Sequence, residues 1–187
     1  MANEHARTLL IFAHPALERA RLNPVLLAAV ADLPGVTVRD LYELYPDFAV
    51  DVPEEHRLLA EHDLIVLQFP LYWYAAPALL KEWVDVVWLP GFAYGAGGGA
   101  MAGKTLMCAV TTGSGEESYA GFSACDPTLE DFLLPWAQAA RLAEMRWSPP
   151  FSVHAATLLS DGVLAAEAAR YRERLIDLAR TTRRGPA

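Results

Sequence analysis

The sequence has few cysteines, no excess of positive charge and no long apolar run. Its two cysteines, Cys108 and Cys125, are too few for a disulfide framework or a metal-binding cluster, so no metal site is expected. The formal net charge of −8 argues against a nucleic-acid partner, because contacts to a phosphate backbone need clustered Lys and Arg. No apolar stretch is long enough to cross a membrane, and the N-terminus lacks the pattern of a signal peptide. These features indicate a cytoplasmic protein.

What is present is an alternation of strand and helix patterns. The 187 residues are 53% hydrophobic and 20% charged, which is typical of one globular domain spanning 1–187. The predicted strands are 8–13, 36–41, 63–69, 106–111 and one within 145–153, and the predicted helices are 23–33, 53–61, 77–88, 128–143 and 164–180. Asn23 is expected to cap its helix, and Pro135 to kink or divide the fourth one. The alternation predicts an α/β domain with a parallel sheet covered by helices on both faces.

In such folds ligands bind beyond the carboxyl ends of the strands. The loop after the first strand contains His14, Arg19, Arg21 and Asn23 and leads into a helix, whose free N–H groups and dipole favour an anion. The Gly-rich patterns of dinucleotide-binding and P-loop proteins are absent from the sequence. An ordinary surface loop is the alternative reading of these residues.

The loop after the third strand carries Leu71-Tyr72-Trp73-Tyr74 where polar residues are usual. So much flat apolar surface needs cover, which a planar ligand, a second subunit or the protein's own core could provide. The loop after the fourth strand, 111–116, is small and rich in donors, as would suit a ring with carbonyl groups on its edge. Alone it also fits a plain glycine-rich turn.

Several segments together resemble the flavodoxin-like NAD(P)H:quinone oxidoreductase family of the DT-diaphorase type. They are Ala13-His14-Pro15 with Asn23, residues 68–85 (QFPLYWYAAPALLKEWVD), residues 91–94 (GFAY) and Thr111-Thr112-Gly113. Residues 41–48 (LYELYPDF) and the AYGAGG stretch resemble one branch, the ancillary subunits of glutathione-gated potassium efflux systems. The resemblance implies a flavodoxin-like three-layer sandwich with a five-stranded sheet in the order 2-1-3-4-5.

The resemblance also implies a non-covalently bound flavin, with FMN favoured over FAD because the chain lacks the long C-terminal extension of the larger enzymes. His14, Arg21 and Asn23 would hold the phosphate, although Ala20 stands where the family usually has Ser or Thr. Residues of the third-strand loop would wall the ring: Pro70, Leu71, Tyr72, Trp73 and Tyr74. Residues of the fourth-strand loop would bond its polar edge: Thr111, Thr112, Gly113 and Ser114. Tyr119 lies where the family has a tyrosine that donates toward the flavin or the hydride acceptor.

The implied reaction carries a hydride from NAD(P)H through FMN to a quinone or similar electrophile. Family members have a histidine at about the position that Cys125 occupies in this chain. Because this chain has no histidine there, the role of the family histidine cannot be transferred to it. The other histidines do not cluster in sequence and are expected to be surface or core residues.

Helix 77–88 looks apolar nearly all round, and Phe92 and Tyr94 follow it. We therefore expect a homodimer in which Phe92 and Tyr94 lie at the interface and over the partner's substrate.

An alternative reading is a regulatory ancillary subunit that docks on a potassium efflux transporter. It would place the protein peripherally, at the inner face of the membrane.

Overall fold

The computed structural model describes residues 6–121 and 126–183. Its strands form one parallel sheet in the order β2-β1-β3-β4-β5, with β6 also beside β4, which confirms the predicted order. The strands are β1 (Thr8–Phe12), β2 (Val36–Asp40), β3 (Leu64–Pro70), β4 (Thr105–Thr111), β5 (Arg146–Trp147) and β6 (Phe151–Val153). Pro149 and Pro150 separate β5 from β6, because proline cannot donate a hydrogen bond within a sheet. The single fifth strand of the prediction is therefore two short segments.

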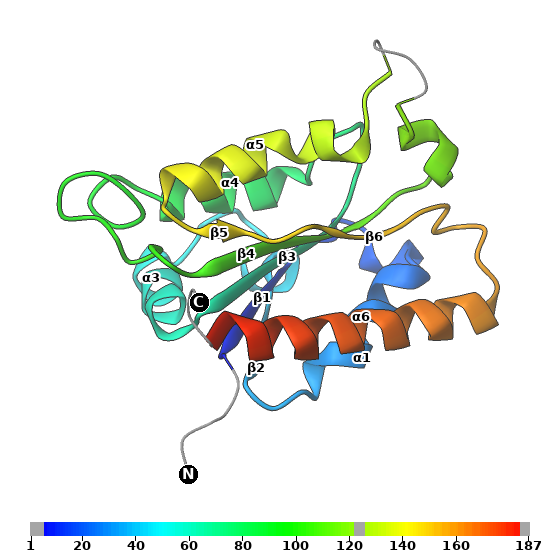
Figure 1. Cartoon of the computed structure of the whole chain (residues 1–187), viewed down its shortest axis with the longest axis horizontal. Helices are drawn as coiled ribbons and strands as arrows, with labels where there is room; N and C mark the ends of the chain where they lie inside the picture. Colours follow the sequence, from blue (N-terminus) through cyan, green and yellow to red (C-terminus); the bar gives the residue numbers. More distant parts are fainter. Residues whose placement is uncertain (1–5, 122–125, 184–187) are drawn as a thin grey trace.

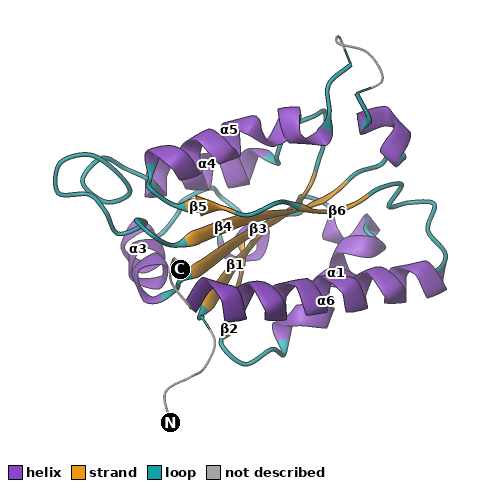
Figure 2. Ribbon diagram, viewed as in Figure 1, coloured by secondary structure: helices purple, strands orange, loops and turns teal. Residues whose placement is uncertain are grey.

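Helices cover both faces of the sheet (Figures 1 and 2). They are α1 (Leu22–Ala31), α2 (Leu41–Leu44), α3 (Val52–Glu61), α4 (Ala78–Val87), α5 (Leu129–Leu142) and α6 (Asp161–Arg183), with 3-10 turns η1 (Leu17–Arg19) and η2 (Glu116–Tyr119). One apolar core lies between the sheet and α3, α4 and α5, and a second lies between the sheet and α1 and α6. In the described part of the chain, no helix is both long and apolar enough to span a membrane.

The predicted cap at Asn23 is wrong, and the predicted division of the fourth helix at Pro135 does not occur. Asn23 is not a cap: α1 begins at Leu22 with Arg21 at the N-cap, and Asn23 is a buried residue of the first turn. Pro135 does not divide α5, which runs unbroken to Leu142. Pro135 lacks only its own N–H, and a capping box between Thr128 and Asp131 stabilises the start of that helix.

The prediction that helix 77–88 is apolar nearly all round is also wrong. Its buried residues are Leu79, Leu80, Trp83 and Val87, which share one stripe. The opposite side is exposed and charged, and there Lys81 and Asp85 form an ion pair. The helix is therefore amphipathic, and most of its apolar surface is already covered by its own chain.

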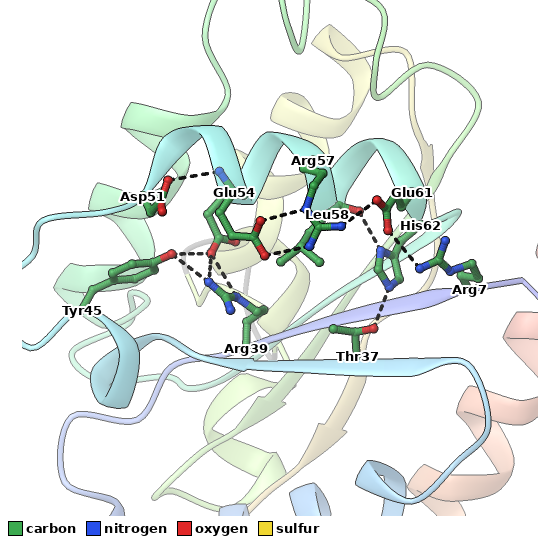
Figure 3. A network of polar contacts seen from close by, with 11 residues as sticks. Arg7, Thr37, Arg39, Tyr45, Asp51, Glu54, Arg57, Leu58, Glu61 and His62 are labelled. Carbon is green, nitrogen blue, oxygen red and sulfur yellow. Dashed lines mark hydrogen bonds and ion pairs between the residues drawn. The ribbon is translucent and has the colours of Figure 1, made fainter.

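A polar network fastens β2 and α2 to α3 (Figure 3). Glu55 is fully buried, and its Oε1 accepts hydrogen bonds from Arg39 Nη2 at 2.6 Å and from the Tyr45 hydroxyl at 2.6 Å. Burial and the neighbouring carboxylate raise the pKa of Tyr45 to about 12, so its hydroxyl stays protonated and donates. The network therefore holds the segment after β2 against the body of the protein.

Candidate functional site

The loops after β1, β3 and β4 meet at the carboxyl edge of the sheet and enclose two adjoining cavities. The first, the polar cavity, has a volume of about 140 Å³ and is lined by His14, Arg19, Ala20, Arg21, Leu22, Asn23, Pro70, Tyr72, Thr111, Thr112, Gly113, Ala156 and Thr157. The second, the aromatic cavity, has a volume of about 380 Å³ and is lined by Leu71, Tyr72, Trp73, Tyr74, Gly113, Ser114 and Tyr119. The two cavities share Tyr72 and Gly113. All thirteen residues expected to bind the cofactor or act in catalysis thus lie in one continuous site.

His14 lies at the wall of the polar cavity and is 4% exposed. Its Nδ1 accepts a hydrogen bond from the Ala16 N–H at 3.2 Å, which leaves the proton of the neutral ring on Nε2. The only protein group near Nε2 is the Tyr72 hydroxyl at 3.4 Å, within the described residues. Burial lowers the pKa of His14 and outweighs the opposing effect of Glu18, so the ring is neutral at pH 7. His14 therefore offers one N–H donor to whatever enters the cavity.

Asn23 and Thr111 form the floor of the polar cavity. Asn23 Nδ2 donates to Thr111 Oγ1 at 2.8 Å, and Asn23 Oδ1 is buried with no partner within the described residues. Turning the amide leaves its atoms in place: Thr111 then donates to Oδ1, and Nδ2 becomes the atom without a partner. Either atom costs free energy while it is buried and unpaired, but only the N–H can be satisfied by an anion. The donors of this floor thus fit an anionic group such as a phosphate.

The start of α1 adds backbone donors to the polar cavity. No side chain caps the first turn, so its N–H groups and the helix dipole are available to an anion. The predicted phosphate residue Arg21 lines the cavity, but its guanidinium is held by the Leu159 carbonyl oxygen and by Asp161 at 2.8 Å. Arg21 therefore fastens α1 to the start of α6, and less of its charge is available to a ligand.

The aromatic cavity is bordered by a strained turn. Tyr72 and Ala75 exchange two backbone hydrogen bonds of 3.0 Å, and the two residues between them have positive φ angles, 50° at Trp73 and 64° at Tyr74. Positive φ at both central positions is typical of a type I′ turn, which favours Asn and Gly rather than bulky aromatics. Tyr74 stacks on Phe132 of α5, while Trp73 is 94% exposed. Such strain is characteristic of functional sites, and the exposed ring offers a flat face.

His154, expected to be an ordinary surface or core residue, lies at the aromatic end of the site. Its Nδ1 is 3.0 Å from Thr112 Oγ1, and its ring centroid is 5.4 Å from that of Tyr119. The Thr112 hydroxyl also donates to the Ser114 carbonyl oxygen at 2.8 Å, which indicates that His154 Nδ1 carries a proton and donates to Thr112. Ala156 and Thr157, which line the polar cavity, follow it. Nothing in the sequence marks the loop after the fifth-strand region, because it lacks glycine-rich or aromatic patterning.

Phe92 and Tyr94 lie away from both cavities. They belong to the segment between α4 and the start of β4, at the end of the sheet opposite to β6 (Figure 1). The Phe92 ring stacks on His56 at 3.5 Å, and both aromatics pack against their own core.

Cys125, at the position of the family histidine, is outside the described residues. A separate apolar cavity of about 220 Å³ lies at the amino edge between β1, β2 and α6, and it has no converging donors.

A model of the flavodoxin-like fold family matches residues 6–175. The chain is 43% identical to the glutathione-regulated potassium-efflux system ancillary protein KefG of Cronobacter sakazakii, over 95% of this chain and 96% of that protein.

Three solved structures share the fold. A general stress protein 14 of Treponema denticola in complex with FMN has a TM-score of 0.85 and 32% identity, with 92% of this chain and 99% of that chain covered. An NADPH-quinone reductase of P. pentosaceus has a TM-score of 0.81 and 33% identity, with 90% and 97% covered. A protein described as a thermophilic tryptophan halogenase from Streptomycin violaceusniger has a TM-score of 0.86 and 40% identity, with 90% and 98% covered.

Proposed function

We propose, because the chain belongs to the flavodoxin-like fold family, that it is an FMN-dependent NAD(P)H oxidoreductase acting on a quinone or similar flat electrophile. One observation carries the proposal: a cavity with anion donors adjoins a cavity with aromatic walls, and the two share Tyr72 and Gly113. A flavin mononucleotide has these two parts, an anionic phosphate and a flat ring. The FMN complex of one similar protein and the quinone reductase activity of another support the same reading.

The residues of the site have separate tasks in this proposal. His14 Nε2–H, the Asn23 amide and the first turn of α1 hold the phosphate. Trp73 and Tyr74 wall the ring and exclude water, while Thr111, Thr112, Gly113 and Ser114 meet its polar edge. Bound FMN would supply the chemistry of hydride transfer between NAD(P)H and the electrophile. Tyr119 lines the aromatic cavity beside His154 and is placed to donate a hydrogen bond toward the reacting groups.

The test begins with an absorption spectrum of the purified protein and identification of the released cofactor. We expect a flavin spectrum, FMN rather than FAD after release, and oxidation of NADH or NADPH that requires a quinone. Flavin-free protein that gains neither spectrum nor activity on addition of FMN would refute the proposal.

The proposed active form is a homodimer. Trp73 is 94% exposed, and within one chain Phe92 and Tyr94 lie at the other end of the sheet, so only a second copy could bring them over the aromatic cavity. Light scattering at micromolar concentration should give twice the mass of the chain. Tyr94→Ala should change acceptor kinetics while FMN affinity stays nearly intact. A fully active monomer would rule the dimer out.

A second function is supported by the relatives. Proteins 43–44% identical over at least 90% of this chain are ancillary proteins of potassium-efflux systems. The chain would then be a cytoplasmic subunit that docks on such a transporter at the membrane. Co-purification with a co-expressed transporter tests this function. Asn23→Ala, in which FMN binding should be weakened, separates the two functions when it is assayed at an FMN concentration below its dissociation constant. Docking should survive in this variant if regulation does not depend on the reductase.

A further inference from the structure

Strand β3 buries one amide side chain among apolar neighbours. Gln68 is 0% exposed and lies between Leu67 and Phe69, which are also fully buried. A buried amide is costly unless its donors and acceptor are paired, so its partners indicate why it is there.

The partners of Gln68 join it to the polar cavity. Tyr171 of α6, 0% exposed, donates from its hydroxyl to Gln68 Oε1 at 3.1 Å. Gln68 Nε2 donates to the backbone carbonyl oxygen of Asn23 at 3.4 Å, and the Asn23 side-chain amide is hydrogen-bonded to Thr111 Oγ1. Four buried polar residues from α6, β3, α1 and β4 thus form one chain of hydrogen bonds that ends at the cavity floor.

The direction of this chain is fixed by its chemistry. A backbone carbonyl oxygen can only accept, so Gln68 must turn Nε2 toward Asn23 and Oε1 toward Tyr171. Burial raises the pKa of Tyr171 far above its usual value, so the hydroxyl remains a donor at any working pH. The bonded carbonyl belongs to the first turn of α1, the same turn that offers its free N–H groups to the cavity.

We infer that Gln68 and Tyr171 are positioning residues for the phosphate end of the bound flavin, an inference that rests on the proposed function. Neither side chain lines the cavity, so both act through Asn23 by fixing the first turn of α1 against the sheet. Their removal should therefore affect a phosphate-bearing flavin more than one without phosphate.

The test compares FMN with riboflavin, which has the same ring and no phosphate. Dissociation constants are measured by flavin fluorescence for the wild type, Tyr171→Phe and Gln68→Leu. Tyr171→Phe keeps the ring and its packing, and loss of one buried hydrogen bond should weaken FMN about threefold to tenfold. Gln68→Leu removes both bonds and should weaken FMN by more, while riboflavin affinity changes by less than about twofold in both variants.

A matched control removes a buried hydroxyl bond from the same helix at the other end of the sheet. Thr182 Oγ1 donates to Thr105 Oγ1 at 3.2 Å, and both residues are buried. Thr182→Val should leave both flavin affinities unchanged. Equal weakening of FMN and riboflavin in Tyr171→Phe and Gln68→Leu, or unchanged FMN affinity, would overturn the inference and leave the proposed function standing. A wild type that binds neither flavin would overturn both.

Discussion

Two buried histidines show how the two ends of the sheet differ. At the amino edge, His62 is 0% exposed, and both of its ring nitrogens have partners: the Leu58 carbonyl oxygen at 2.6 Å and Thr37 Oγ1 at 2.8 Å. At the carboxyl edge, His14 has a firm partner for Nδ1 only, and its Nε2 faces a cavity. Burial lowers the pKa of both rings. The two rings differ in whether a ring nitrogen is still free to form a hydrogen bond. His14 has such a nitrogen and can bind a ligand, whereas both nitrogens of His62 are used in holding the fold together.

A similar contrast separates the network around Glu55 from the candidate site. On the α3 side, Glu55 Oε1 accepts three hydrogen bonds from Arg39 and Tyr45, and all three residues are tied to one another (Figure 3). On the site side, Trp73 and Tyr74 hold unfavourable backbone conformations. Each region also has one buried side-chain atom with no partner among the described residues, in the Asn23 amide and at Glu55 Oε2. Bonds within the protein stabilise the first region, whereas the second holds backbone strain and borders cavities that a ligand can fill.

The largest effect should come from breaking the enclosed ion pair. Glu55→Ala leaves the Arg39 guanidinium, with a side chain only 16% exposed, without its carboxylate. Loss of one partner of such a pair should lower the free energy of unfolding by about 3–5 kcal/mol. Urea denaturation measures this change. At a temperature where the variant is folded, its FMN affinity should equal that of the wild type.

The neighbouring residue provides the control. Glu54 pairs with Arg57 on the exposed side of the same helix, so Glu54→Ala should change stability little. If both variants lost the same stability, burial of the pair would not be what makes Glu55 important.

A smaller effect is expected at the polar cavity, and there FMN affinity should change instead of the free energy of unfolding. Asn23→Ala removes a donor beside a charged group, which should weaken FMN binding by about 1.5–3 kcal/mol. Fluorescence titration measures the loss, and riboflavin binding should be affected much less. Wild-type FMN affinity in this variant would remove Asn23 from the phosphate site.

Sequence alone could predict the sheet and the place of the site, because both depend on local patterns. The apolar runs of β1, β3 and β4 and the loops that follow them are readable without coordinates. The capping role given to Asn23 failed because its side chain bonds to Thr111, 88 positions away. His154 could not be found for the same reason: its partners Thr112 and Tyr119 come from other loops, and only the folded sheet brings them together.

The two histidines can be compared directly by NMR titration with and without FMN. A phosphate next to His14 Nε2 favours the charged ring and should raise the pKa of His14. His62 lies at the other end of the sheet with both nitrogens engaged, so its pKa should not move. An equal change at both rings would indicate a global effect of flavin on the protein. An unchanged pKa at His14 would place the phosphate elsewhere.

The smallest predicted effect separates strain from packing within the turn of the aromatic cavity. Trp73→Asn replaces a ring that is 94% exposed by a residue that tolerates positive φ, so the apo-protein should become more stable by about 1 kcal/mol. Tyr74→Asn relieves similar strain but loses the stacking on Phe132, so it should show no such gain. Urea denaturation of both apo-variants gives the comparison, and FMN titration should show weaker binding in each. Trp73→Asn with lower stability than the wild type would mean that the Trp73 ring packs against protein, and it would remove the argument that the turn stores strain for a ligand. Higher stability together with weaker flavin binding would show that this loop, unlike the network around Glu55, sacrifices stability for binding.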